Sequence, residues 1–427
     1  MLIHTVKRGE SLASIGAEYG VSPDIIGGLN GLSAMSPPAV GQGLIIRFPK
    51  RIHTVRAGDS LSSLAVIYGV TVNALFRANP WLYGSASLTV GQRLVIDYTE
   101  TPPYDFLAGG YVYTFTPRRL LEQTAPFVNV LIPFTYGFRQ DGSLYATDDA
   151  RVLDVAKRFG TEAWMHLSTY TEGERFDTEL ATGLLASTGV QDLLIEAVLA
   201  TMEEKGYSGL DVDFEFIGKE NALPYARFLE RLHGPLSERG YTLTAALAPK
   251  TSATQAGSLY EGHDYAAVGA AVDYVLLMTY EWGYTLGPPL AVSPLPSVRR
   301  VIDYALTVIP KEKIFLGISN YGYDWALPYN KEEPVAAPSL STEAAVALAL
   351  STGAEIQYDN EWQAPFFTYE KEGVRHEVWY EDVRSINARL ALIPEYGLSG
   401  ALYWNLTRPN TGNLSLLAAV DRRVGES

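Results

Sequence analysis

The sequence predicts an α/β fold, in which a closed (β/α)8 barrel of the TIM type carries a small α+β insertion and follows two small α+β modules. Two observations predict this organisation. A segment of about 49 residues occurs twice at the N-terminus, and eight apolar, β-rich runs then alternate with helical patterns. With 427 residues, of which 47% are hydrophobic and 19% charged, the chain is long enough for several globular units.

The N-terminal repeat begins at Ile3 and again at Ile52, reading IHTVKRGESLASIGAEYGVSPDIIGGLN and then IHTVRAGDSLSSLAVIYGVTVNALFRAN. In the second copy, a β run leads through a Gly-Asp turn to Ser60, which is suited to cap a helix. Gly69 ends that helix, a second helix follows over 71–78, and a strand led by a Gly-Gln turn closes the unit. Each copy is therefore expected to fold as β-α-α-β, over residues 2–48 and 51–98.

This repeat resembles the LysM module, and the two copies agree with each other. The resemblance implies binding of N-acetylglucosamine-containing glycans such as peptidoglycan. The alternative is a small α+β repeat without a ligand. Residues 99–103 (TETPP) are interpreted as a short, stiff linker, and residues 104–427 as the barrel. With such a linker, deletion of residues 1–98 is expected to weaken wall binding and to leave turnover of small fragments nearly intact.

The eight expected barrel strands are short apolar runs separated by amphipathic helical patterns such as 149–159, 190–205, 223–239 and 297–309. The strands are expected at 110–115, 128–134, 163–168, 209–214, 242–248, 274–279, 314–319 and 399–404. About 80 residues separate the last two runs, which is too long for one crossover. An α+β insertion is therefore predicted at about 327–379.

The fourth expected strand carries three acidic residues at alternate positions, in the sequence Gly-Leu-Asp-Val-Asp-Phe-Glu. Because side chains alternate along a strand, Asp211, Asp213 and Glu215 point to one side, with Glu215 nearest the carboxyl end where barrel active sites lie. Like charges in one lumen raise at least one pKa, which favours a proton-donating acid. A divalent-metal site, or acids satisfied by hydrogen bonds, stays open at this point.

The same segment resembles the D-x-D-x-E motif of glycoside hydrolase family 18, the chitinases and related N-acetylglucosaminidases. Met278 to Glu281, Tyr321-Gly322-Tyr323 and Trp404 resemble later motifs of that family. The resemblance implies a retaining reaction in which the substrate's own acetamido oxygen attacks the sugar carbon.

In that reaction the resemblance gives each matching residue a role. Glu215 would protonate the leaving oxygen, while Asp213 and Tyr280 would hold the acetamido group. Asp211 would support Asp213, and Trp404 would form the floor under the cleaved sugar. Further expected contacts to substrate come from Glu281, Met278, Tyr111, Phe115, Phe134, Tyr136, Asn320 and Tyr321. No cofactor and no metal are expected.

Two positions depart from the family pattern. Ser208 stands where many members have an Asp, and Glu281 stands where chitinases usually have Asp. The second change makes a simple chitinase a poorer match than a relative with altered subsites.

Longer matches narrow the resemblance to the spore peptidoglycan N-acetylglucosaminidases, known as cortical fragment-lytic enzymes. They are Met278 to Gly283, Gly287 to Pro294, Tyr321 to Trp325 and His376 to Asp382. This implies cleavage after N-acetylglucosamine in cortex peptidoglycan, and a place in the spore or cell wall. The alternatives are a chitinase or chito-oligosaccharide hydrolase, and a non-catalytic glycan-binding wall protein.

Charge and composition exclude several other classes of function. The net charge of −15 argues against nucleic acid as the main partner, and the absence of Cys excludes thiol chemistry and Cys-ligated metals. The first 98 residues nevertheless carry 8 Lys and Arg against 5 Asp and Glu. No signal peptide and no membrane span are expected from the sequence, and the oligomeric state is left open.

Overall fold

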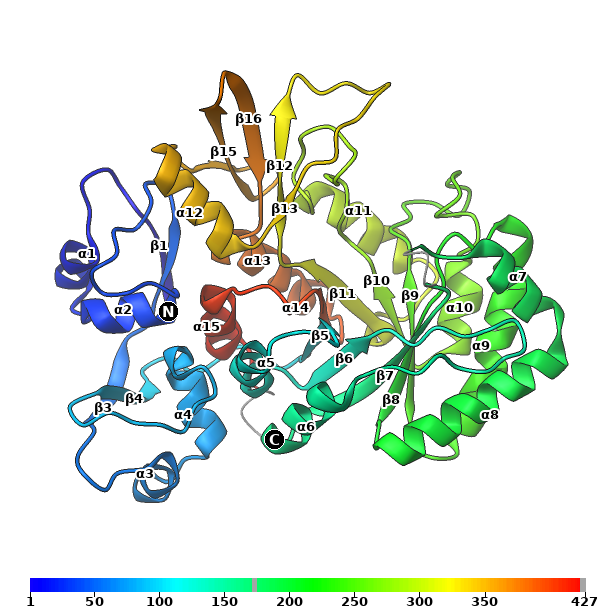
Figure 1. Ribbon diagram of the computed structural model, residues 1–427, viewed down its shortest axis with the longest axis horizontal. Helices are drawn as coiled ribbons and strands as arrows, with labels where there is room; N and C mark the ends of the chain where they lie inside the picture. The colour runs from blue at the N-terminus through cyan, green and yellow to red at the C-terminus, as the bar shows by residue number, and fades with distance from the viewer. Residues whose placement is uncertain (171–174, 423–427) are drawn as a thin grey trace.

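The computed structural model describes residues 1–170 and 175–422. Its centre is a closed barrel of eight parallel strands, which confirms the predicted fold class (Figure 1). The order around the barrel is β5 (Leu107–Tyr113), β6 (Val130–Phe134), β7 (Glu162–Ser168), β8 (Gly209–Asp213), β9 (Thr242–Leu247), β10 (Tyr274–Leu277), β11 (Ile314–Ser319) and β17 (Gly400–Trp404).

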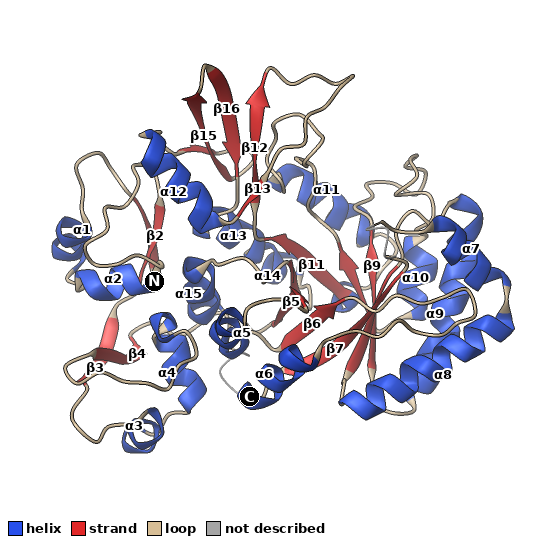
Figure 2. Cartoon of the chain, in the orientation of Figure 1, coloured by secondary structure: helices blue, strands red, loops and turns tan. Residues whose placement is uncertain are grey.

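Helices surround the barrel and cover its strands (Figure 2). They are α5 (Arg118–Thr124), α6 (Ala150–Phe159), α7 (Thr178–Ala186), α8 (Thr188–Lys205), α9 (Ala222–Ser237), α10 (Tyr265–Ala271), α11 (Leu295–Ala305), α13 (Val383–Leu390), α14 (Leu392–Tyr396) and α15 (Thr411–Val420). Short 3-10 turns lie at Pro80–Leu82, Ala125–Phe127, Lys219–Asn221 and Lys311–Lys313.

Helix α8 illustrates how the sequence sets these elements. Ser187 caps its N-terminus by accepting a hydrogen bond from the Val190 amide, and Gly206 ends it in the left-handed conformation at φ 76°. Leu194, Val198 and Met202 recur every four residues and are fully buried. The helix therefore packs one apolar stripe against the sheet.

The two N-terminal modules have the predicted β-α-α-β order. The first pairs β1 (Leu2–Thr5) with β2 (Gly43–Ile46) around α1 (Leu12–Tyr19) and α2 (Pro23–Leu29). The second pairs β3 (Pro49–Thr54) with β4 (Arg93–Tyr98) around α3 (Leu61–Tyr68) and α4 (Val72–Ala78). Ser11 and Ser60 each form a capping box at the first helix of their module.

Both modules pack directly on the rest of the molecule. In Figure 1 they lie on one flank, beside α15 and α5, and α15 contacts α2, β2 and α4. Leu75 and Phe76 belong to the same apolar cluster as the barrel core. Asn73 Nδ2 donates to the Phe159 carbonyl at 2.7 Å, and Ser415 Oγ donates to the Leu29 carbonyl at 2.6 Å. The modules therefore share packing and hydrogen bonds with the barrel. The expectation that turnover of small fragments stays nearly intact after deletion of residues 1–98 did not include this packing.

The insertion is an antiparallel sheet in the order β13-β12-β16-β15-β14, accompanied by α12 (Thr342–Thr352). Its strands are β12 (Gly322–Leu327), β13 (Ser339–Leu340), β14 (Gln357–Asp359), β15 (Ala364–Lys371) and β16 (Val374–Trp379). The sheet takes in β12, which precedes the expected start near residue 327. The first module also contacts the insertion, because the Ile356 amide donates to the Val40 carbonyl at 3.0 Å.

In residues 1–170 and 175–422, no single helix is long and apolar enough to cross a membrane, although two bent helix pairs pass that test by length and composition.

Candidate active site

The acids of the fourth barrel strand reach a cavity of about 240 Å³ at the carboxyl end of the barrel. Asp213 ends β8, and Glu215 lies two residues beyond the strand. The acidic residues that line the cavity are Asp213, Glu215 and Glu281. The rest of the lining is largely aromatic and apolar: Tyr111, Tyr113, Phe134, Tyr170, Phe176, Pro249, Leu259, Tyr260, Met278, Tyr280, Trp282 and Trp404. A cavity of this kind suits a ligand with both polar groups and apolar faces.

Asp211 lies below Asp213 and is fully buried. The Tyr111 hydroxyl donates to Asp211 Oδ2 at 2.8 Å. Burial raises the pKa of Asp211 to about 7, with the neighbouring charge of Asp213 acting in the same direction. Near neutral pH this carboxyl can therefore hold or release a proton.

Glu215 has the electrostatic surroundings of a proton donor. Burial raises its pKa well above the ordinary value of a glutamate, and the charges of Asp213 and Glu281 raise it further. A carboxyl group that keeps its proton at neutral pH is suited to general acid catalysis.

His166 is a buried residue of this site that the sequence reasoning missed. It lies on β7 in register with Asp211, and its Nε2 is 3.6 Å from Asp211 Oδ2 and 3.7 Å from Asp213 Oδ2. The sequence did contain a pattern that could have indicated His166. His166 and Ser168 are two residues apart in a predicted strand, so their side chains point to the same face.

Trp404 and Tyr280 bound the cavity from two different strand ends. Trp404 is the last residue of β17, and its indole makes edge contacts with the rings of Tyr111, Tyr113 and Phe134 at 5.1–6.0 Å. Tyr280 follows β10 and is nearly buried, which raises the pKa of its hydroxyl well above 10. The hydroxyl therefore stays protonated and can donate a hydrogen bond.

Two tyrosine hydroxyls form hydrogen bonds to the Glu281 carboxylate. Tyr321 and Tyr323 donate their hydroxyls to Glu281 Oε1, the second at 2.9 Å. The residue has φ +65°, a left-handed conformation that non-glycine residues rarely adopt. Burial of the carboxylate raises its pKa, although the side chain as a whole has exposed surface. The Tyr321 ring thus supports Glu281 from outside the cavity lining.

Three residues expected to contact substrate do not line this cavity. Phe115 lies beyond β5, 71% exposed, with its ring stacked on Tyr113 at 5.0 Å. Tyr136 points toward the outer helices, where its hydroxyl donates to Asp149 and accepts from Lys205 Nζ at 2.6 Å. Asn320 is buried, and its amide donates to two backbone carbonyls of the 405–408 segment. None of the three lines the cavity, because each lies outside the barrel lumen.

Met278 and Phe134 do line the cavity, as expected. The residues that sequence reasoning missed, apart from His166, come mostly from loops after the strands, such as Tyr170, Tyr260 and Trp282. Such loop positions carry no periodic signal.

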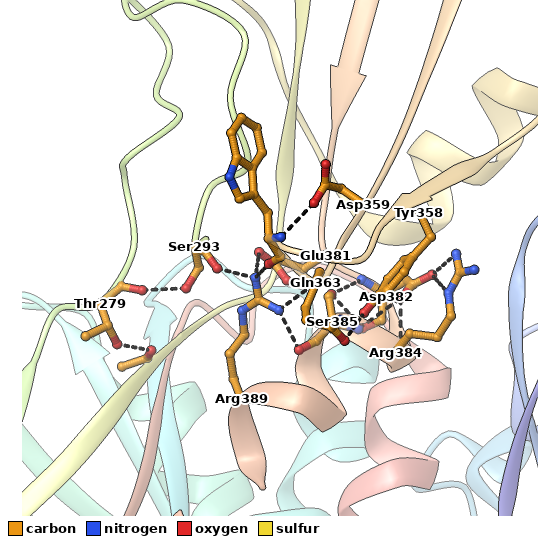
Figure 3. A network of polar contacts seen from close by, with 12 residues as sticks. Thr279, Ser293, Tyr358, Asp359, Gln363, Glu381, Asp382, Arg384, Ser385 and Arg389 are labelled. Atoms are coloured by element: carbon orange, nitrogen blue, oxygen red, sulfur yellow. Dashed lines mark hydrogen bonds and ion pairs between the residues drawn. The ribbon is translucent and has the colours of Figure 1, made fainter. Parts of the chain in front are cut away.

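A buried polar network fixes the loop that carries Tyr280 and Glu281 (Figure 3). Ser293 Oγ donates to the Thr279 carbonyl at 2.6 Å, and Arg389 donates to the Ser293 carbonyl. Arg389 also donates to the carbonyls of Gln363 and Ser385, both at 2.7 Å. This guanidinium is 1% exposed, so it joins the loop to the insertion and to α13 without contact with solvent.

Within the described part of the chain, no group of three or more His, Asp or Glu side chains has an arrangement that could hold a metal ion.

Comparison with known proteins agrees with this site. The family description "Glycosyl hydrolases family 18" matches residues 112–408, which include the barrel acids and Trp404. The chain belongs to glycosyl hydrolase family 18. LysM domains match residues 4–47 and 53–97, so the predicted resemblance of the N-terminal repeat is also confirmed.

Proteins described as cortex-lytic or cortical fragment-lytic enzymes match two thirds or more of this chain. A cortical fragment-lytic enzyme of Bacillus anthracis is 36% identical over 421 residues, covering 97% of each chain. One from Bacillus subtilis (strain 168) is 40% identical over 290 residues, covering 68% of this chain and 67% of the relative. The crystal structure of the Bacillus cereus spore cortex-lytic enzyme SleL has a TM-score of 0.83 at 35% identity, covering 100% of this chain and 99% of that one.

Proposed function

We propose that this chain hydrolyses β-1,4 glycosidic bonds after N-acetylglucosamine in spore cortex peptidoglycan. The observation that carries the proposal is that Glu215, whose pKa burial raises well above the ordinary value, lines the same aromatic cavity of a family 18 barrel as Asp213. The relatives named as cortical fragment-lytic enzymes, with the same module order, support the choice of substrate. Spore or cell-wall association follows from that substrate.

In the proposed reaction, Glu215 donates its proton to the leaving glycosidic oxygen. Burial and the neighbouring acids raise the pKa of Glu215, which favours the protonated form that this step needs. After departure of the leaving group, the same carboxylate takes a proton from the attacking water, so the acid is regenerated.

The acetamido oxygen of the substrate acts as the nucleophile in this proposal. Asp213 faces the cavity and stabilises the positive charge that develops on the acetamido group. The Tyr280 hydroxyl holds the acetamido oxygen, and Trp404 supports the apolar face of the sugar. Asp211, buried below Asp213, holds or releases a proton as the charge on Asp213 changes. The acetamido oxygen displaces the leaving group with inversion at the anomeric carbon, and water then displaces the acetamido oxygen with a second inversion, so the configuration is retained and the acetamido group is restored.

The LysM modules are proposed to hold the enzyme on the glycan. They carry 8 Lys and Arg against 5 Asp and Glu, while the rest of the chain is acidic. A positively charged pair of modules favours contact with an anionic wall polymer.

The test is digestion of purified Bacillus subtilis spore peptidoglycan, with the new reducing ends identified by mass spectrometry. Glu215→Gln keeps the size of the side chain and removes the titrating proton, so activity should fall about 10²–10⁴-fold. Glu220→Gln changes an exposed glutamate nearby and should act like the wild type. Muramic-acid reducing ends, or full activity of Glu215→Gln, would refute the proposal, and chitin oligomers offered alone test the chitinase alternative.

A further inference from the structure

Three buried polar atoms belong to neighbouring residues of β7 and β8 in the barrel interior. They are Nε2 of His166, Oδ1 of Asp211 and Oδ1 of Asp213, and among the described residues none of them has a hydrogen-bond partner. Buried polar atoms are rarely left unpaired, and clusters of them occur where groups change partners during function. His166 is 0% exposed, so solvent does not satisfy its ring.

The other ring nitrogen of His166, Nδ1, contacts a chain of hydroxyl groups, which bears on the position of the imidazole hydrogen. Nδ1 is 2.6 Å from Thr135 Oγ1, which is 2.8 Å from Ser168 Oγ. Ser168 Oγ accepts from the Tyr170 amide at 3.2 Å, so its own proton is free to be donated to Thr135. Thr135 can then donate to Nδ1, which places the hydrogen of the neutral imidazole on Nε2. In the opposite tautomer, Thr135 accepts from Nδ1 and donates to the Tyr136 carbonyl at 3.3 Å.

The opposite tautomer is disfavoured electrostatically. It would place a nitrogen lone pair toward Oδ2 of both Asp211 and Asp213, at 3.6 and 3.7 Å. An imidazolium would carry a hydrogen on Nε2 as well. In either favourable state, therefore, an N–H of His166 points between the two carboxylates.

His263 offers an internal comparison, because it is the other fully buried histidine that touches this region. Its Nδ1 accepts from the Ala248 amide and its Nε2 donates to the Phe214 carbonyl, both at 2.9 Å. Both nitrogens of His263 are thus satisfied by the backbone, as in a structural histidine. His166 differs in that Nε2 faces two titratable groups instead of a carbonyl.

Besides the two aspartates, one titratable side chain, Tyr111, packs against His166. From β5, Tyr111 meets the imidazole edge-on at 5.3 Å, and from β6 the Phe134 ring lies at 4.9 Å. Glu215 and Tyr280 interact with Asp213 from the cavity side. Among the described residues, the carboxylates of β8 are therefore the only acids within ion-pair distance of His166.

We propose that His166 is a positioning residue that holds Nε2–H between the carboxylates of Asp211 and Asp213 and stabilises the charged form of Asp211. This inference rests on the proposed glycosidase function. A donor shared by two carboxylates favours their charged forms, so it opposes the effect of burial. As Asp213 acquires and loses contact with the substrate, the N–H remains available to whichever carboxylate carries the charge.

Two substitutions separate this role from a structural one. Gln places an amide nitrogen at the position of Nε2, whereas Asn reaches only the position of Nδ1. His166→Asn should raise the pKa of Asp211, so the acid limb of the kcat/KM profile moves up by about one pH unit, which lowers the rate at pH 5 roughly tenfold. His166→Gln should keep the wild-type acid limb. His263→Asn, the matched control, should lower Tm and leave the pH profile unchanged.

The assay measures release of N-acetylglucosamine reducing ends from soluble Bacillus subtilis spore peptidoglycan fragments between pH 4 and 8. Thermal unfolding identifies the folded fraction to which each rate is normalised. An upward shift in His166→Asn that is absent in His166→Gln supports the proposal. The proposal is overturned if the acid limb of the kcat/KM profile is unshifted in His166→Asn, or if both variants lose the same fraction of kcat/KM at every pH. Failure of the proposed function itself looks different, because the wild-type chain would then release no such reducing ends.

Discussion

Two glycines at equivalent positions of the repeats test the contact between the first module and the insertion. Gly41 and Gly91 precede the same glutamine in the two repeats and have φ +82° and +89°. A Cβ on Gly41 would lie 1.8 Å from the Ile356 carbonyl oxygen, whereas a Cβ on Gly91 would meet nothing within 4 Å. The two alanine variants therefore share the backbone strain and differ in the clash.

The size of the difference follows from those distances. A left-handed alanine costs about 1–2 kcal/mol in both variants. Since 1.8 Å is far below any allowed contact, Gly41→Ala additionally forces the module away from the insertion, at a cost of about 1–3 kcal/mol. Local opening at this contact should then become about 5- to 150-fold more frequent in Gly41→Ala.

Hydrogen exchange of the Ile356 amide measures this opening, because that amide donates to the Val40 carbonyl across the contact. Exchange should accelerate in Gly41→Ala and stay at the wild-type rate in Gly91→Ala. Equal acceleration in both variants, or none in either, would refute the reasoning that the first module is docked through this turn.

Three further predictions concern the site and its supports. Tyr280→Phe removes one hydroxyl donor and should lower kcat about 10²- to 10³-fold with little change in Tm; a change confined to KM would contradict the assigned role. Burial raises the pKa of Glu381 to about 7, so this acid binds more protons in the folded than in the unfolded state between its ordinary pKa of 4.5 and 7, and its contribution to stability falls as pH rises through that window. Glu381→Gln should flatten the dependence of Tm on pH between 5 and 7, and an unchanged slope would argue against it. Deletion of residues 1–98 exposes apolar barrel surface, so Tm should fall and activity on soluble fragments should fall with it, unlike for a detachable module.

Much of the fold could be predicted because it depends on local patterns. Most of the eight barrel strands are short, largely apolar runs, and the observed strands overlap every expected run. The repeat copies carry their own caps at Ser11 and Ser60, so each module's helices are specified within the module. The alternation of side chains along β8 likewise placed Asp211 and Asp213 on one face of the sheet.

The sequence by itself therefore determined the barrel, the modules and the acids of β8, since these depend on periodicity and on neighbours in the chain. Only the tertiary structure decided which residues from different strands meet. His166 reaches Asp211 across 45 positions, and Tyr136 turns outward to Asp149 and Lys205 even though Phe134 on the same segment lines the cavity. The physical reason is that barrel closure and the docking of modules bring distant backbone segments together, and these long-range contacts leave no periodic trace in the sequence.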